Sequence, residues 1–380
     1  MPAASRVLVV GAGIAGTAAA ILLAEAGVAV DLVEVKPDVT ALGSGITLQG
    51  NALRVMRQLG VWDAAREQGF AFDTVGFRAP DPAGTLVMEA ADARFGGADL
   101  PATLGMYRPD LARLLVARAT GLGVTVRYGT SVTALRGLTG QTGDGVDVTF
   151  TDGRAARYDV VVGADGIRSR VRDLLGIDAG TVPLGMGIFR AFTPRPASVT
   201  RTDLFYGGPS YIAGYCPTGQ ESLYCYLVEP ARDRSGQTPG QLLADLRELS
   251  LAYHGPWDEI RAVLTDPATV SYTWFETHVV PAPWNRGRVV LIGDAAHTCP
   301  PTVAQGAAMA FEDGAVLAEL LVTRPAVDEA LWQAFTDRRF ARASAVVEAS
   351  NTLARWQLDR VQGDVGSLMG RLAAVLVAPA

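Results

Sequence analysis

Lysine is almost missing from the sequence. Lys36 is the only lysine among 380 residues, whereas arginine occurs 32 times. A coding bias toward arginine is the simplest cause of this imbalance. Its consequence holds whatever the cause: a mechanism that needs a catalytic lysine has to use Lys36, because arginine does not lose its proton in proteins.

Cysteine and histidine are also scarce, with three residues of each. No two cysteines form a C-x-x-C pair, which argues against a redox dithiol and against a thiolate zinc site. The three histidines lie far apart in the chain, and no two of them have the spacing of metal ligands. The sequence therefore predicts no metal centre. The residues concerned are Cys216, Cys225, Cys299, His254, His278 and His297.

Long apolar runs and clusters of positive charge are absent as well. No apolar stretch reaches the roughly 18 residues that a membrane span needs. The net charge of -6 and the lack of a Lys/Arg run argue against a nucleic-acid partner. The N-terminus enters an apolar strand at once and lacks the charged start and cleavage site of a signal peptide. With 49% apolar and 19% charged residues, we expect a globular cytoplasmic protein with no membrane partner.

The first forty residues contain a glycine-rich turn between two apolar strands. Residues 7–10 form the first strand, an alanine-rich helix follows the turn, and the second strand, residues 28–33, ends at Glu34. The G-x-G-x-x-G spacing in this context predicts a dinucleotide, with its pyrophosphate at the helix N-terminus and its adenosine ribose at Glu34. The pattern does not distinguish FAD from NAD. The cofactor-binding residues predicted here are Gly11, Gly13, Ile14, Ala15, Gly16, Glu34, Val35 and Lys36.

The middle of the chain contains a second strand, turn and helix start, but without the G-x-G-x-x-G spacing. Residues 106–119 predict a helix with Pro109 in its first turn. Residues 158–175 predict an apolar strand, a sharp turn at Gly163–Gly166 and a basic helix start. Because no second G-x-G-x-x-G exists, we expect no separate nicotinamide-binding domain.

Residues 181–278 differ in character from the rest. They consist of short, alternating, aromatic-rich segments, which favour an antiparallel sheet inserted between the halves of a doubly wound domain. We therefore expect an α/β fold with a Rossmann-like dinucleotide-binding domain, an inserted, mainly antiparallel β-sheet domain for the substrate, and C-terminal helices. The predicted ranges are 1–72, 101–180 and 279–325 for the first, 73–100 and 181–278 for the second, and 326–380 for the third.

Three motifs stand in order along the chain: "GAGIAG" near the start, "VGADGIRSRVR" in the middle and "LIGDAAHTCPP" late. Alone, Asp294 and His297 of the late motif suggest half of a hydrolase or a metal site. Together the three motifs resemble the single-component FAD-dependent aromatic hydroxylases, the para-hydroxybenzoate hydroxylase family. The resemblance covers nearly the whole chain and implies that the first domain binds FAD.

The resemblance implies roles for the residues of the middle and late motifs. Asp294, after Gly293, would bind the ribityl chain of FAD, and Arg108 would lie near the flavin. The middle motif would serve both FAD and NAD(P)H through Asp165, Gly166 and Arg168. The late loop and the helix after it would face the pyrimidine edge of the flavin, where the helix dipole favours the anionic reduced form. The residues of this last group are Pro301, Gly306, Ala307 and Ala308.

The late motif also departs from the family. Members often read G-Q-G-A-N where this chain has Ala304 to Ala308. The missing asparagine at position 308 removes one possible flavin contact, although backbone amides remain. We interpret His297 as mainly a structural residue of the turn.

The implied reaction is the hydroxylation of an aromatic ring. NAD(P)H, a transient co-substrate, reduces tightly but non-covalently bound FAD; O2 then forms a flavin C(4a)-hydroperoxide that attacks a small or medium phenolic or N-heterocyclic substrate. The sequence leaves open which ring and position react, NADH or NADPH, an epoxidation or Baeyer–Villiger outcome, and monomer or homodimer. Two alternatives also stay open: an FAD-dependent reductase or dehydrogenase acting on an apolar substrate, and a non-catalytic flavin-binding module. A halogenase is disfavoured because Lys36 lies at the adenosine end and no W-x-W-x-I-P segment occurs.

Candidate substrate residues come from the inserted sheet and the late loop. Tyr224 and Tyr226 share a strand face by period 2. Arg190 lies in an apolar strand, where a charge is costly unless it is paired or faces a wet cavity, so it is a candidate for steering an acidic or phenolic substrate. Ordinary sheet packing is the alternative for each of these residues. The predicted catalytic residues are Arg190, Tyr215, Pro300 and Pro301, and the predicted substrate contacts are Tyr206, Tyr211, Tyr215, Tyr224 and Tyr226.

Overall fold

A mainly parallel six-stranded sheet organises one lobe of the protein. The computed structural model describes residues 1–39, 44–137 and 145–380. The strand order in this sheet is β18-β19-β12-β1-β2-β8, with only β18 antiparallel. The strands are β1 (Arg6–Val10), β2 (Ala29–Val33), β8 (Thr125–Arg127), β12 (Val160–Gly163), β18 (Asn285–Arg286) and β19 (Val289–Leu291).

The apolar runs predicted from the sequence form the centre of this sheet. Val7 to Val10 of β1 are at most 2% exposed, because β2 and β12 flank them and helices cover both faces. Helix α1 (Ile14–Glu25) packs against α8 (Gly306–Thr323). Gly314 of α8 allows this approach, since a Cβ there would lie 2.7 Å from the Ala15 carbonyl oxygen.

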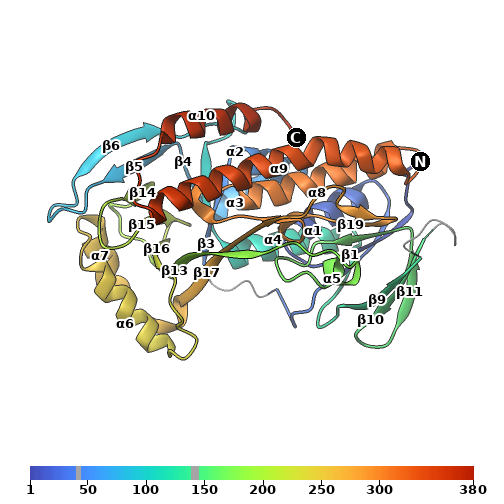
Figure 1. The fold of residues 1–380 in the computed structure, drawn as a ribbon, viewed down its shortest axis with the longest axis horizontal. Coiled ribbons are helices and arrows are strands. Elements are labelled where there is room, and N and C mark those ends of the chain that lie inside the picture. The colour runs from blue at the N-terminus through green and yellow to red at the C-terminus, as the bar shows by residue number, and fades with distance from the viewer. Residues whose placement is uncertain (40–43, 138–144) are drawn as a thin grey trace.

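An eight-stranded sheet forms the second lobe, in the order β20-β17-β13-β16-β15-β14-β5-β6. Its long strands β13 and β17 run from this lobe toward the first one (Figure 1). The sheet is mainly antiparallel, as expected. Its strands are β5 (Thr74–Arg78), β6 (Leu86–Ala91), β13 (Val182–Pro194), β14 (Thr202–Phe205), β15 (Ile212–Pro217), β16 (Ser222–Pro230), β17 (Val270–Val279) and β20 (His297–Thr298).

One face of the large sheet is closed by two helices. Helices α6 (Pro239–Ser250) and α7 (Pro256–Val263) cover it, and their side chains form a second core with those of β13, β15 and β16. Leu246 and Trp257, for example, are fully buried there. The opposite face is the one that turns toward the first lobe.

The remaining strands form two smaller sheets. A three-stranded sheet in the order β3-β7-β4 packs between the lobes, and a three-stranded hairpin sheet, β11-β10-β9, lies beside the parallel sheet. Their strands are β3 (Gly45–Gln49), β4 (Phe70–Phe72), β7 (Thr103–Tyr107), β9 (Val132–Arg136), β10 (Val146–Phe150) and β11 (Ala155–Tyr158).

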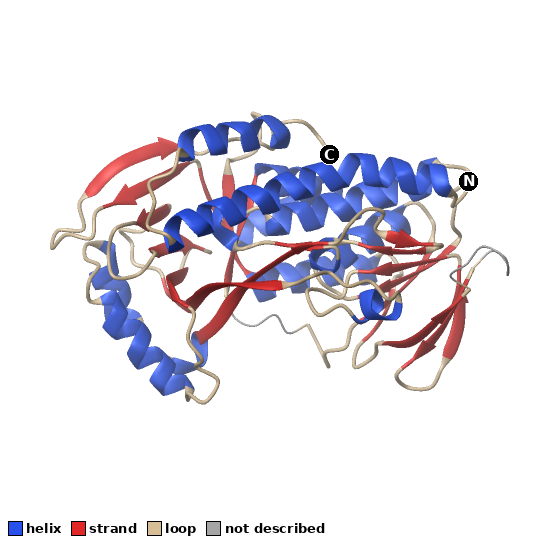
Figure 2. Cartoon of the chain, in the orientation of Figure 1, coloured by secondary structure: helices blue, strands red, loops and turns tan. Residues whose placement is uncertain are grey.

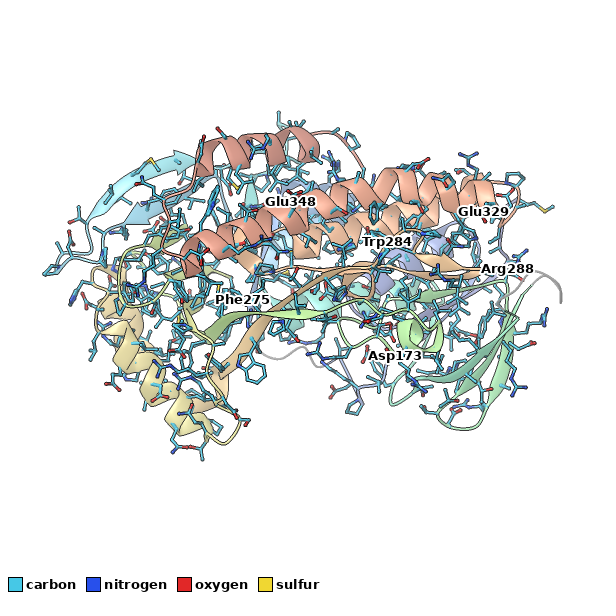
Figure 3. The ribbon with its side chains drawn as sticks, in the orientation of Figure 1. Asp173, Phe275, Trp284, Arg288, Glu329 and Glu348 are labelled. Atoms are coloured by element: carbon cyan, nitrogen blue, oxygen red, sulfur yellow. The ribbon has the colours of Figure 1, made fainter. Side chains whose placement is uncertain are left out.

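The C-terminal region is helical, as predicted. Helix α9 (Glu329–Leu358) is 30 residues long and runs along α8 across both lobes (Figure 2). Figure 3 labels Phe275 of β17 and Trp284, which pack against α9 through Ala354 and Phe335 respectively. The remaining helices are α2 (Gly50–Gln58), α3 (Trp62–Gln68), α4 (Arg108–Gly121), α5 (Arg170–Leu174) and α10 (Val365–Leu376), with short 3-10 turns η1 (Pro267–Thr269), η2 (Gly293–Ala295) and η3 (Pro301–Val303).

Candidate active site

A cavity of about 480 Å³ opens at the carboxyl ends of β1 and β2. The chain leaves β1 for β2 on one side and later places β12 on the other, so this is the switch point at which open α/β sheets bind ligands. The predicted residues that line the cavity are Gly11, Gly13, Ile14, Glu34, Val35, Lys36, Arg108, Asp165, Gly166 and Arg168.

The three glycines of the first motif have different surroundings. A Cβ on Gly11, whose φ is +107°, would lie 2.3 Å from the Ala164 carbonyl oxygen, and one on Gly16 would lie 2.1 Å from the Gly11 carbonyl oxygen. These two glycines are therefore required by the protein's own backbone packing. A Cβ on Gly13 would meet no atom of the described residues within 4 Å, which leaves space there for a ligand that approaches the N-terminus of α1.

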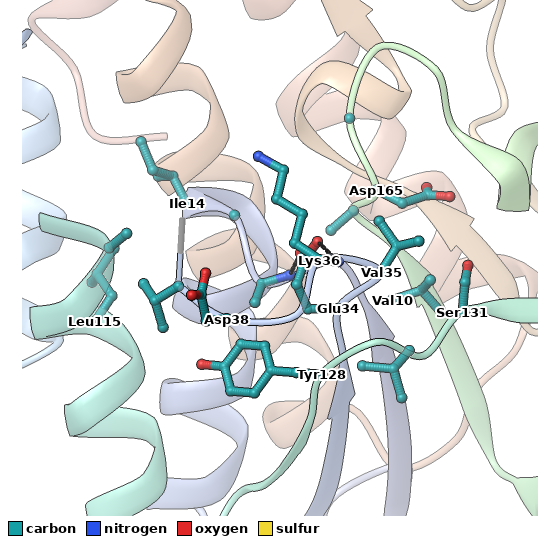
Figure 4. Close-up of a pocket in the computed structure, with 18 of the residues that line it drawn as sticks. Val10, Ile14, Glu34, Val35, Lys36, Asp38, Leu115, Tyr128, Ser131 and Asp165 are labelled. Carbon is teal, nitrogen blue, oxygen red and sulfur yellow. Dashed lines mark hydrogen bonds between the residues drawn. The ribbon is translucent and has the colours of Figure 1, made fainter. Parts of the chain in front are cut away.

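Glu34 holds the start of this turn as well as lining the cavity. One carboxylate oxygen accepts from the backbone N–H of Ala12 at 2.9 Å and the other from the N–H of Lys36 at 3.0 Å. Figure 4 shows Glu34 between Ile14 and Leu115 on one side and Asp165 on the other. Each oxygen retains a second lone pair, so Glu34 can still accept from ribose hydroxyls.

The middle motif contributes backbone and charge rather than a free carboxylate. Asp165 accepts from the Val171 N–H at 2.9 Å and from the Ser169 hydroxyl, so its side chain fixes the start of α5. Burial raises the pKa of the Asp165 carboxyl. Arg168 lies at the cavity and donates to both oxygens of Glu276 in β17 at 2.7 Å, which connects the two lobes.

The late motif presents one carboxylate from an otherwise buried turn. Asp294 in η2 is exposed, whereas residues 291–293 and 295–298 around it are buried. The charges of His297 and Arg108 both favour the ionised form of the Asp294 carboxyl. Since Arg108 also lines the cavity, Asp294 lies within electrostatic range of a cavity residue.

Two of the predicted cofactor residues pack against the protein interior, and their cofactor role stays a prediction. Ala15 and Gly16 face the interior and do not line the cavity. A Cβ on Gly293 would lie 2.8 Å from the Ala15 Cβ, so Ala15 is the surface on which the late turn rests. Ala308 is 1% exposed and also points inward, whereas Gly306 at the start of α8 has open space at its Cβ position.

His278 is a residue of this region that the sequence did not reveal. Its Nδ1 lies 2.9 Å from the Thr181 hydroxyl, and its Nε2 lies 3.1 Å from the Asp294 carbonyl oxygen. Burial, with nearby Arg172, lowers the pKa of His278 to about 4. The neutral ring therefore donates from Nε2 and supports the turn from below, and no pattern in the strand marks it for this role.

His297 also supports the turn, in agreement with its predicted structural role. Its Nε2 lies 2.6 Å from a carboxylate oxygen of Asp313 in α8, which also accepts from the Gly293 N–H at 2.8 Å. Burial acts to raise the pKa of Asp313, but His297 and Arg339 outweigh it and lower the pKa to about 2. The paired acids in "AFEDG" and an arginine on an apolar helix face were the available sequence signals for this network.

The face of the large sheet that α6 and α7 do not cover, called the open face, carries aromatic side chains around one arginine. Arg190 lies opposite Tyr226, and Phe192 lies opposite Tyr224, so all four share this face. The Tyr224 and Tyr226 rings stack with centroids 5.1 Å apart, as the period predicts, and Tyr107 of β7 meets Phe192 at 4.0 Å. Tyr107 directly precedes Arg108, so this aromatic face adjoins the cofactor residues.

Arg190 has a polar but uncharged environment. It donates to the Thr273 hydroxyl and makes no ion pair with any residue that the structure describes. Burial raises the pKa of Tyr224, and the charge of Arg190 acts against that rise, so the two side chains are close enough to interact.

The position of Tyr215 argues against its predicted role. Tyr215 points to the other face of the sheet, where it is 1% exposed in the core beneath α6 and α7. Its hydroxyl donates to Asp203 at 2.7 Å. A substrate on the open face does not reach it, because residues i and i+1 of a strand point to opposite faces. The structure therefore places Tyr215 in the core, away from the face that the substrate is proposed to contact.

The other predicted substrate residues differ in their exposure and in the side chains that they contact. Tyr206 is 41% exposed and stacks with Phe77, and Tyr211 packs beside the Phe275 cluster near α9. Pro300 is buried and Pro301 exposed at the end of the late loop.

Within residues 1–39, 44–137 and 145–380, no group of three or more His, Cys, Asp or Glu side chains is arranged to hold a metal ion.

Comparison with known proteins identifies the family. Residues 4–350 match the family described as the FAD binding domain. The chain belongs to this FAD-binding family. It is 32% identical over 376 residues, 98% of both chains, to a putative FAD-dependent monooxygenase, YetM, of Bacillus subtilis. It is also 32% identical to 6-hydroxynicotinate 3-monooxygenase of Pseudomonas fluorescens, over 92% of this chain and 91% of the relative.

Solved structures agree with this assignment. The tetrameric form of 2-methyl-3-hydroxypyridine-5-carboxylic acid oxygenase superposes with a TM-score of 0.78 at 27% identity, covering 93% of this chain and 91% of that one. HpxO of Klebsiella pneumoniae, solved with FAD and uric acid, gives a TM-score of 0.81 at 23% identity over 98% and 92%, a likeness of fold. This member of the FAD-binding family is an FAD-dependent monooxygenase. No helix in the described part of the chain is both long and apolar enough to span a bilayer.

Proposed function

We propose that this enzyme hydroxylates a small aromatic or N-heterocyclic ring that carries an acidic group, with NAD(P)H as electron donor and O2 as oxidant. The observation that supports this most strongly is Arg190, a half-buried arginine without an ion pair among the described residues, on a sheet face of aromatic side chains. Such a face suits a flat ring, and its single cation suits the acid of that ring.

The cofactor side of the proposal rests on the residues around the cavity. Gly13 leaves open space at the N-terminus of α1 for a pyrophosphate, and Glu34 retains lone pairs for a ribose. Asp294 presents its carboxylate to a hydroxyl of the ribityl chain, next to Arg108. FAD bound there supplies two-electron transfer from NAD(P)H and the activation of O2.

The substrate side assigns positions to the ring and its acid. Tyr224, Tyr226 and Phe192 give a flat apolar surface, and Tyr107 connects it to Arg108. In this arrangement Arg190 binds the acidic group of the substrate and thereby orients the ring. Pro300 and Pro301 close the late loop beside it, which reduces the access of water to the reacting centre.

Two of the relatives named above support a ring acid over a plain phenol. Their names specify 6-hydroxynicotinate and 2-methyl-3-hydroxypyridine-5-carboxylic acid, both nitrogen heterocycles that carry a carboxylate. We extend only the shared chemistry, a hydroxylated ring with an acid, to this enzyme.

The test is the anaerobic reduction of bound FAD by NADH or NADPH, followed by the loss of visible absorbance, with and without a panel of ring acids. We expect at least one ring acid to accelerate reduction many-fold. Its amide or methyl analogue, which lacks the charge, should be a poor substitute. Bleaching that no ring changes would favour a reductase or dehydrogenase, and ring binding without any NAD(P)H oxidation would favour a non-catalytic module.

Two variants connect this result to Arg190. Arg190→Met should raise the KM for the ring acid by about ten- to a hundredfold, the loss of one charge-assisted hydrogen bond of about 1.5–3 kcal/mol. Arg232→Met is the control: Arg232 is exposed, its Nε lies 3.6 Å from Glu229 Oε2 in the same lobe, and its replacement should leave KM unchanged. Equal effects of both variants would contradict the role of Arg190.

A further inference from the structure

Two consecutive acids in α8 are buried beneath the candidate FAD site. Glu312 and Asp313 are 1% and 0% exposed. One oxygen of Asp313 accepts from the Gly293 N–H and faces His297, and the other accepts from Arg339 Nε at 2.7 Å. Asp313 therefore holds the first end of the late loop, residues 293–306.

Glu312 holds the second end of the same loop. Its Oε1 accepts from the side-chain amide of Asn51 at 3.3 Å, and that amide also donates to Gln305 Oε1 at 2.9 Å. Gln305 in turn donates to Gln49 of β3. Gln305 directly precedes α8, so Glu312 fixes the residue at which the loop enters the helix.

One guanidinium joins these two acids. Arg339 of α9 donates from Nε to Asp313 and from NH1 to Glu312 at 2.9 Å, and its own exposure is 0%. Arg342, one turn later, binds only Glu312 of the two acids, at 2.7 Å from both Nε and NH2. Arg339 is thus the one described side chain that contacts both acids.

We propose that Arg339 is a positioning residue for FAD: by bridging Asp313 and Glu312, it fixes the Asp294 turn relative to the N-terminus of α8. This rests on FAD binding at the late loop and not on the reaction or the substrate. The planar guanidinium has two donor edges for two separate carboxylates, a geometry that a lysine ammonium does not reproduce. Without the bridge the two carboxylates lose their shared partner and can reorient independently, and each is linked by hydrogen bonds to one end of the loop, although neither end touches Arg339.

The experiment compares Arg339→Lys with Arg338→Lys in the holoenzyme. Arg338 is the adjacent residue, but it pairs with Glu319 near the surface of α9. The first measurement is the rate at which FAD leaves, followed by recovered flavin fluorescence. The second is amide hydrogen exchange across residues 292–306. We expect Arg339→Lys to release FAD about tenfold faster, the equivalent of one charge-assisted hydrogen bond, and to exchange faster in this segment. Arg338→Lys should match the parent chain in both.

A purely structural role would give a different result. In that case Arg339→Lys would lower the thermal midpoint but leave both the FAD release rate and the exchange of residues 292–306 unchanged, and this result would overturn the proposal.

Asn51→Leu provides a second test that leaves both acids and Arg339 in place, so the proposal stays testable if Arg339→Lys does not fold. It cuts only the link between Glu312 and Gln305, and we expect faster FAD release together with faster exchange near Gln305. Unchanged release in this variant would also count against the proposal. Since neither measurement uses NAD(P)H or a ring, the outcome is independent of whether the proposed hydroxylation is correct.

Discussion

Replacing Gly13 with alanine is expected to separate cofactor binding from folding. The backbone of Gly13 has φ −76° and ψ −174°, a conformation open to any residue. Among the residues that the structure describes, no atom lies within 4 Å of the added methyl group, so the free energy of unfolding of the FAD-free chain should change by less than about 1 kcal/mol. The methyl group instead occupies the space proposed for the pyrophosphate. Losing one charge-assisted hydrogen bond there, about 1.5–3 kcal/mol, weakens FAD binding roughly ten- to a hundredfold.

The matched variant is Gly16→Ala, three residues away in the same motif. Its methyl group would lie 2.1 Å from the Gly11 carbonyl oxygen, so the backbone must shift and we expect a loss of about 1–3 kcal/mol or more in stability. Urea unfolding of the FAD-free chains and fluorescence titration with FAD measure both effects. Equal destabilisation by the two variants, or unchanged FAD affinity in Gly13→Ala, would refute this account of the site.

Three further predictions follow from single residues. Ala304 has the left-handed φ of 52°, which costs about 1–2 kcal/mol for a residue with a Cβ, so Ala304→Gly should raise the thermal midpoint; a lower midpoint would contradict the strain. Tyr215→Phe removes a buried hydrogen bond to Asp203 and should lower the free energy of urea unfolding by about 1.5–3 kcal/mol with no change in substrate KM, whereas a raised KM would return Tyr215 to the site. Burial lowers the pKa of His278 in the folded state to about 4, below the usual 6.5 of a solvent-exposed imidazole. The unfolded chain therefore binds the extra proton first, so stability should fall as the pH drops from 6.5 to 4. His278→Gln should flatten that dependence in chemical unfolding at stepped pH, and an unchanged slope would contradict the assignment.

The sequence predicted the parts of the site that depend on local pattern. The spacing of Gly11, Gly13 and Gly16 between two apolar strands is a local feature, and the structure places the turn and a cavity there. The period of two also put Tyr224 and Tyr226 on one face, as their stacked rings show. The predicted fold class is confirmed for the same reason, because the apolar pattern of a strand and the first residues of a helix can be recognised from residues that are close in sequence.

The remaining features depend on contacts between distant segments. Period 2 states which residues share a face but not which face other elements cover, so the sequence alone does not exclude Tyr215, which lies beneath α6 and α7. Arg339 meets Asp313 across 26 residues of sequence, and His278 meets Asp294 across 16. No local pattern specifies such partners, since they follow from how α9 and β17 pack in the folded chain. The predicted domain boundaries and the substrate roles stay predictions.

The most direct test of the central claim is turnover in isotopically labelled O2 with the ring acid that accelerates flavin reduction. A ring monooxygenase incorporates one labelled oxygen atom into the product for each NAD(P)H consumed in coupled turnover, and mass spectrometry of the product detects it. We predict a single labelled oxygen on the ring. A product without label, or NAD(P)H oxidation that yields only hydrogen peroxide with every ring acid tested, would contradict the account.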